Sequence, residues 1–241
     1  MATPRGADAI FDNAITFDAP SPEGEEATNY EIGYRTSRPQ INGAIALYYT
    51  EFDNRIVAGS VLNPATEEPE SFFINAGETT AWGVEISGVY QPEFFNDMVF
   101  GIVNFTYNNT ELQDGFGVNP AGSQLADSPE FFGTVGVTVE PTDYIVANLT
   151  GRYTGERFAD FQEAATQPGN RMEAFWNWSA FVDFGGPNPF GISENVSLRF
   201  NVDNILDEDT LAFTFTTTGN GNAFYRPFNP RTFQATLVVA F

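Results

Sequence analysis

The last ten residues of the chain, TFQATLVVAF, are apolar at every second position. Alternation with a period of two predicts a strand that has two different faces. A chain terminus normally frays into water, so an apolar strand that ends on an aromatic residue needs a core or lipid to hold it. The apolar row consists of Phe233, Ala235, Leu237, Val239 and Phe241.

The same alternation recurs along nearly the whole sequence, in about ten segments separated by turns. No segment keeps the 3.6-residue period of an α-helix. Without helical crossovers the strands cannot be parallel, so we predict an all-β fold, an antiparallel meander of about ten strands. The expected strands cover residues 9–17 (weak), 29–36, 41–55, 72–90, 98–112, 128–140, 144–158, 171–184, 194–206 and 231–241.

The expected connections alternate between short and long. The short set is 38–40, 91–97, 140–143 and 185–193, and the long set is 59–70, 113–127, 159–170 and 207–230. Short turns at one rim and long loops at the other are typical of outer-membrane barrels, whereas a soluble sandwich has no reason to sort loop lengths. We therefore predict a transmembrane β-barrel or part of one, with Phe241 at the short-turn, periplasmic rim.

Each expected strand has an apolar row of side chains on one face and a polar row on the other, and the two rows suggest separate roles. The aromatic residues on the apolar rows are expected to anchor the barrel at the membrane interface, rather than to stack on carbohydrate. They are Trp82, Tyr90, Trp176 and Trp178. The charged residues opposite the apolar rows would face a wet lumen, although a soluble sandwich would also hold them in water. They are Glu85, Arg152, Asp183, Arg199 and Asp203.

Composition excludes several functions. The 32 acidic residues outnumber 10 basic ones, which argues against a nucleic-acid partner. The chain has no Cys and no His, so the common catalytic triads and zinc sites are absent. We expect no enzyme activity, cofactor or metal. The acidic residues at 203–209 lack the EF-hand pattern of a calcium site. For Arg226 and Arg231, a salt bridge at the rim is favoured over a substrate clamp. A pair of glycosidase carboxylates cannot be singled out among so many acidic residues.

Four stretches resemble strands of the C-terminal barrel portion of TonB-dependent outer-membrane receptors, and they occur in the family's order. They are residues 29–35 (NYEIGYR), 83–85 (GVE), 201–208 (NVDNILDE) and 225–233 (YRPFNPRTF). The resemblance covers roughly residues 28–241, preceded by a weak first strand and an acidic loop over 1–27.

The resemblance implies the wall of an outer-membrane transporter for scarce nutrients, such as iron chelates, cobalamin or glycans. A whole receptor has 22 strands around a plug. We find no plug or TonB box here, so we expect a fragment, a truncated reading frame or a degenerate descendant of such a receptor. TonB would act only through the plug that is absent here. The export signal would lie upstream, because residues 1–20 lack the apolar stretch of a signal peptide.

Other expected partners are outer-membrane lipid, an unidentified small nutrient, and the barrel-assembly machinery. By resemblance, that machinery recognises the alternating terminal strand, with Phe233, Leu237, Val239 and Phe241 as the signal. Two alternatives stay open, a self-contained small pore of about ten strands and a secreted all-β carbohydrate-binding module. In a fragment, the strands at 9–17 and 231–241 would be unpaired edges that favour aggregation.

Overall fold

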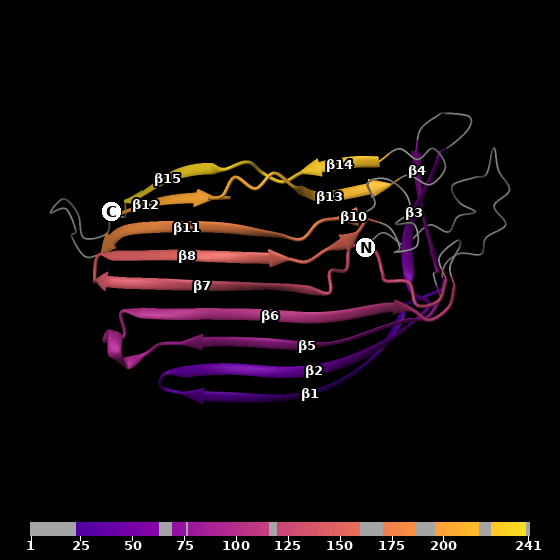
Figure 1. The fold of residues 1–241 in the computed structure, drawn as a ribbon, viewed down its shortest axis with the longest axis horizontal. Coiled ribbons are helices and arrows are strands. Elements are labelled where there is room, and N and C mark those ends of the chain that lie inside the picture. The colour runs from indigo at the N-terminus through magenta and orange to yellow at the C-terminus, as the bar shows by residue number, and fades with distance from the viewer. Residues whose placement is uncertain are drawn as a thin grey trace.

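Nine strands form one antiparallel sheet in a computed structural model that describes residues 23–62, 69–75, 77–115, 120–159, 171–186, 196–216 and 223–239. Each strand pairs with its neighbours in chain order, and β1 and β15 are the two edges of the described sheet (Figure 1). The predicted all-β meander is confirmed. The strands are β1 (Glu26–Arg38), β2 (Ile41–Asp53), β5 (Thr79–Tyr90), β6 (Val99–Leu112), β7 (Phe131–Thr142), β8 (Ile145–Thr154), β11 (Phe175–Gly186), β12 (Val196–Asp203) and β15 (Thr232–Val239).

Connections are sorted by length between the two ends of the sheet, as predicted. Short turns follow β1, β5 and β7, and the turn after β5 contains the 3-10 helix η2 (Glu93–Phe95). The long loops lie at the opposite end (Figure 1). Three of them carry two-stranded hairpins, β3 (Ile56–Leu62) with β4 (Pro69–Asn75), β9 (Arg157–Phe158) with β10 (Arg171–Met172), and β13 (Leu211–Thr216) with β14 (Ala223–Pro227).

These hairpins correct several predicted boundaries. The single strand expected over 72–90 is wrong, because β4 ends at Asn75 and β5 starts at Thr79. Gly77 lies between them with a φ of 86°, a backbone conformation that turns the chain and favours glycine. The strand expected over 144–158 likewise ends at Thr154, and that expected from 171 contributes to the main sheet only from Phe175. The weak strand expected over 9–17 lies outside the described residues.

The register places apolar residues opposite one another from strand to strand. Ile32 pairs with Leu47, Leu47 with Val84, Val84 with Tyr107, and Tyr107 with Phe131. Because side chains alternate along every strand, this register gives the sheet one apolar and one polar face. The apolar face is open, since Ile32 is 72% exposed and Leu47 is 51% exposed. Such an extended apolar surface marks a membrane or protein contact.

Hydrophobic burial is concentrated in the long-loop end. Leu112, Phe158, Met172 and Phe175 are buried there. Within the described ranges no second layer covers the apolar face of the main sheet, unlike the arrangement in a soluble sandwich. The described residues include no helix long and apolar enough to cross a membrane.

Candidate functional site

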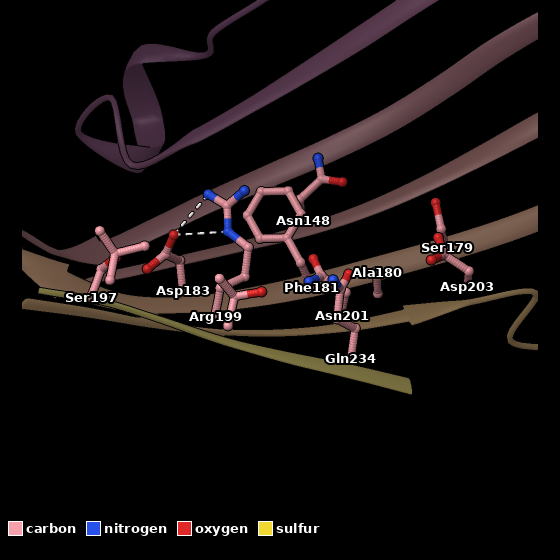
Figure 2. Close-up of a pocket in the computed structure, with 12 residues that line it drawn as sticks. Asn148, Ser179, Ala180, Phe181, Asp183, Ser197, Arg199, Asn201, Asp203 and Gln234 are labelled. Carbon is pink, nitrogen blue, oxygen red and sulfur yellow. Dashed lines mark hydrogen bonds and ion pairs between the residues drawn. The ribbon is translucent and has the colours of Figure 1, made fainter. Parts of the chain in front are cut away.

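An open hollow of about 610 Å³ lies on the polar face of the sheet. Strands β8, β11, β12 and β15 form it, and amide, hydroxyl and charged side chains line it (Figure 2). Among the lining residues are Asn148, Asp183, Arg199, Asn201, Gln234 and Thr236. Alternation places all these side chains opposite the apolar row of their own strand, so the hollow belongs to the face that holds water or a polar ligand.

An ion pair fixes one side of the hollow. Asp183 of β11 and Arg199 of β12 are cross-strand partners, and the Nε and Nη2 atoms of Arg199 lie 2.9 and 2.7 Å from Oδ2 of Asp183 (Figure 2). The guanidinium carbon also lies 4.5 Å from the centre of the Phe181 ring, within the range of a cation–π contact. These contacts hold Arg199 against the wall of the hollow.

The second carboxylate oxygen of Asp183 has a different environment. Oδ1 is buried and accepts no hydrogen bond from the described residues. Buried polar atoms are normally paired with protein or water, so a buried oxygen without a partner among the described residues is unusual. The polar side chains that line the hollow are suited to binding polar groups.

The five charged residues singled out from the sequence all lie in the polar rows of their strands. The structure brings three of them together in the hollow, Asp183, Arg199 and Asp203. Glu85 on β5 and Arg152 on β8 are exposed elsewhere on this face. The neutral lining residues Asn148 and Gln234 were not predicted as site residues, because their proximity depends on the register of four strands. Their only sequence signal was membership of a polar row.

The predicted interfacial aromatic residues lie on the apolar face, near the strand ends. Trp82 is close to the start of β5 and contacts Tyr107 at a centroid distance of 5.3 Å. Trp176 and Trp178 stack at 5.5 Å near the start of β11. Tyr90 ends β5 beside a short turn and is 52% exposed. Anchoring by these rings stays a prediction.

The terminal strand β15 presents its apolar row to solvent. Phe233, Leu237 and Val239 are 75%, 63% and 38% exposed, and every described residue of β15 is in the exposed class. Phe241 lies outside the described residues, so its expected position at the short-turn rim and its part in an assembly signal stay predictions. Val239, the last described residue of β15, pairs with Val196, the first residue of β12.

A cluster at the long-loop rim, the rim cluster, consists of Asn204, Asp207 and Arg231. Arg231 forms an ion pair with Asp207 at 3.1 Å, which confirms the predicted rim salt bridge for this arginine. Asn204 is only 2% exposed, and its side chain hydrogen-bonds backbone atoms of Glu208 and Asn229. No group of three acidic residues that could hold a metal occurs in the described parts of the chain.

Arginines also connect the long loops to one another. Arg157 is 5% exposed, and its Nε donates to Oδ1 of Asp127 at 2.8 Å while its Nη2 donates to the carbonyl oxygen of Ala212 at 2.6 Å. These contacts join three successive long connections. Arg171 pairs with Glu156 at the same rim, and the hydrogen bond to that carboxylate raises the pKa of the Arg171 guanidinium above its ordinary value.

A family model described as TonB dependent receptor-like, beta-barrel matches residues 3–205. The chain therefore belongs to the family of TonB-dependent receptor barrels, which reside in the bacterial outer membrane. The predicted resemblance, fold and outer-membrane location are confirmed. The division of the chain at residue 28 stays a prediction.

Solved structures share the fold at low sequence identity. The ferric citrate transporter FecA in the unliganded form is 24% identical with a TM-score of 0.67, and the match covers 87% of this chain and 30% of FecA. The ferric yersiniabactin uptake receptor FyuA from Yersinia pestis is 16% identical with a TM-score of 0.65, covering 87% and 29%. The copper transporter OprC is 16% identical with a TM-score of 0.65, covering 90% and 31%. The chain thus spans about a third of each structure, and no curated protein matches its sequence.

Proposed function

We propose that this chain forms part of the wall of a receptor barrel that imports a scarce nutrient across the outer membrane. The observation that carries this proposal is the nine-stranded sheet with a continuous apolar face, an opposite polar face and long loops at one end. Lipid covers the apolar face, and the polar face lines the passage. Family membership supports a transport role rather than an enzymatic one.

The nutrient belongs to the iron-chelate, metal, cobalamin or glycan class. FecA is a ferric citrate transporter and OprC a copper transporter, which supports a metal or metal chelate as the first class to test. Asp183, Arg199 and the neighbouring amides supply polar contacts along the passage. TonB acts on the receptor through a plug, and the assembly machinery reads the terminal strand through Phe233, Leu237, Val239 and Phe241.

The direction of the strands supports a wall that is completed by other strands. In a nine-stranded meander the two edges, β1 and β15, run in the same direction. Direct pairing of these edges would be parallel, whereas single-chain outer-membrane barrels are antiparallel with an even number of strands. Closure therefore needs an odd number of additional strands between β1 and β15.

Uptake measurements test the proposed function. Cells that carry or lack the gene encoding this chain would be given labelled ferric chelates, copper, cobalamin or oligosaccharides, with and without a protonophore. We expect loss of the gene to lower the uptake of one of these classes, and the lost component to depend on the proton-motive force. Unchanged uptake of every class would contradict the proposal.

A further inference from the structure

We propose that the rim cluster, Asn204, Asp207 and Arg231, is a register lock for the terminal strand, meaning that it fixes which residues of β15 pair with which residues of β12. In the observed register Val202 pairs with Phe233 and Leu198 with Leu237. The cluster lies at the long-loop end of both strands, where the chain leaves β12 and enters β15 (Figure 1).

The apolar pattern of β15 cannot fix this register by itself. A slip of one residue would turn the apolar row to the polar face, away from the lipid that covers the apolar face in the proposed function. A slip of two residues keeps every apolar residue on the same face, because the pattern repeats every two residues. Val202 would then face Ala235 in place of Phe233. Since β15 has one neighbour in the described sheet and is exposed throughout, packing offers little resistance to such a slip.

Hydrogen bonds from Arg231 supply the missing constraint. Its backbone N–H donates to Oδ1 of Asp207 at 3.0 Å, its Nη2 donates to Oδ2 of Asp207 at 3.1 Å, and its Nη1 donates to the carbonyl oxygen of Ile205 at 3.1 Å. A two-residue slip would move β15 by about 7 Å, since a strand rises about 3.4 Å per residue. All three bonds would break.

The acceptor side of the cluster is itself held firmly. Nδ2 of Asn204 donates to the carbonyl oxygens of Glu208 at 3.0 Å and Asn229 at 2.9 Å, and its Oδ1 accepts the N–H of Glu208 at 2.7 Å. Asn204 and Asp207 have φ angles of 53° and 55°, values that Asn and Asp tolerate better than most residues. The N–H of Ile205 also donates to the carbonyl oxygen of Trp178 at 2.8 Å, which ties this turn to β11.

The register of β15 has two consequences for the molecule. It places Gln234 opposite Asn201 and Thr236 opposite Arg199, and so completes one wall of the polar hollow. It also sets the position of the free edge of β15, against which the next strand of a closed barrel pairs. The stagger of the strands determines whether and how a barrel closes. By fixing how β15 pairs with β12, the rim cluster therefore also fixes where the next strand of a closed barrel can pair with β15.

Cysteine pairs can measure the register directly, because the chain contains no cysteine. Leu198→Cys would be combined with Leu237→Cys for the observed register, or with Ala235→Cys or Val239→Cys for the two slipped registers. Each pair would be introduced into the full chain and into its Asp207→Asn, Arg231→Gln and Arg231→Lys variants. Disulfide formation under mild oxidation in outer membranes is the readout.

In the unaltered rim cluster we expect the 198–237 pair to cross-link at least tenfold more than either slipped pair. In Asp207→Asn and Arg231→Gln we expect a slipped pair to rise to within about threefold of it, with Arg231→Lys intermediate. Arg171→Gln is the matched control, because it removes an ion pair with Glu156 at the same rim that involves neither β12 nor β15, and it should leave the register unchanged. Slipped pairs that stay at background in both cluster variants would overturn the proposal.

A second pair, Ile32→Cys with Leu47→Cys, reports whether the rest of the sheet has formed, because these residues are partners in β1 and β2. We expect this cross-link to persist in every cluster variant. Its loss in all of them would show that the cluster acts on folding of the whole sheet, which would also overturn the proposal. The uptake proposal is tested separately, since the cross-links are independent of any nutrient.

Discussion

Arg199 binds a single oxygen of Asp183 through two of its nitrogens, while the other oxygen of this carboxylate is buried without a hydrogen bond from the described residues. The pair joins β11 to β12 inside the polar hollow. Removal of the charge by Asp183→Asn should destabilise the sheet by about 1 kcal/mol, because Arg199 is 46% exposed and solvent can replace part of the interaction. A double-mutant cycle with Arg199→Gln, followed by urea unfolding, measures the coupling. Additive effects would show that the two side chains do not interact energetically.

The ring of Trp178 packs closely over Gly151. A Cβ atom at Gly151 would lie 2.7 Å from that ring, and the two residues are cross-strand partners on the apolar face. Gly151→Ala should therefore destabilise the protein by about 1–3 kcal/mol through overpacking. Gly101→Ala is the matched control, since its added Cβ would meet only an ordinary contact at 3.7 Å. Equal unfolding midpoints for the two variants would be inconsistent with the observed packing.

Arg157 should hold the long loops together. Arg157→Gln removes an almost fully buried guanidinium and its hydrogen bonds to Asp127 and Ala212. Asp127 is 52% exposed and can be solvated after the change. We therefore expect the free energy of unfolding to fall by about 2 kcal/mol, which is less than the usual cost of breaking a fully buried ion pair. Hydrogen exchange of the described loop residues should rise around Asp127 and Ala212. Arg171→Gln is the control, because that ion pair is largely exposed, and it should leave exchange at those residues unchanged. Similar exchange in both variants would contradict the linking role.

The stability of the rim cluster should depend on the hydrogen bonds that the Asn204 side chain donates. Asn204→Asp keeps the size of the side chain but replaces its Nδ2 donor, which serves the carbonyl oxygens of Glu208 and Asn229. Loss of these bonds at a residue that is 2% exposed should cost about 1–3 kcal/mol. Thermal unfolding of the Asn204→Asp and Asn204→Ala variants measures the cost, and an unchanged midpoint in both would show that the buried amide is not needed.

Much of the sheet could be predicted from alternation alone. Rows such as Phe233, Leu237 and Val239 identify the apolar face because successive side chains of a strand point to opposite sides. The hairpins β3–β4 and β13–β14 were not predicted, since residues 59–70, rich in Pro and Glu, and residues 207–230 were interpreted as long loops, and residues 72–75 as the start of a longer strand. The break at Gly77 was also missed, because alternation continues on both sides of it and only the backbone angle reveals the turn.

The candidate site was less predictable than the fold. The sequence indicated that Asp183, Arg199 and Asp203 are in polar rows, but the hollow arises only from the register of four strands. Contacts such as Asp207 with Arg231 join residues that are 24 positions apart in the sequence, and we propose that they help to set that register. Periodicity therefore predicts which face a side chain lies on, but it does not predict which residues of neighbouring strands are paired.

Tryptophan fluorescence tests most directly whether the apolar face of the sheet contacts lipid. All three tryptophans, Trp82, Trp176 and Trp178, lie on that face. The full chain in its lipid-inserted form would be measured in bilayers that contain phospholipids brominated close to the headgroup, and with the aqueous quencher acrylamide. We expect strong quenching by the brominated lipid and weak quenching by acrylamide. Emission that is insensitive to brominated lipid and strongly quenched by acrylamide would contradict a lipid-facing barrel wall.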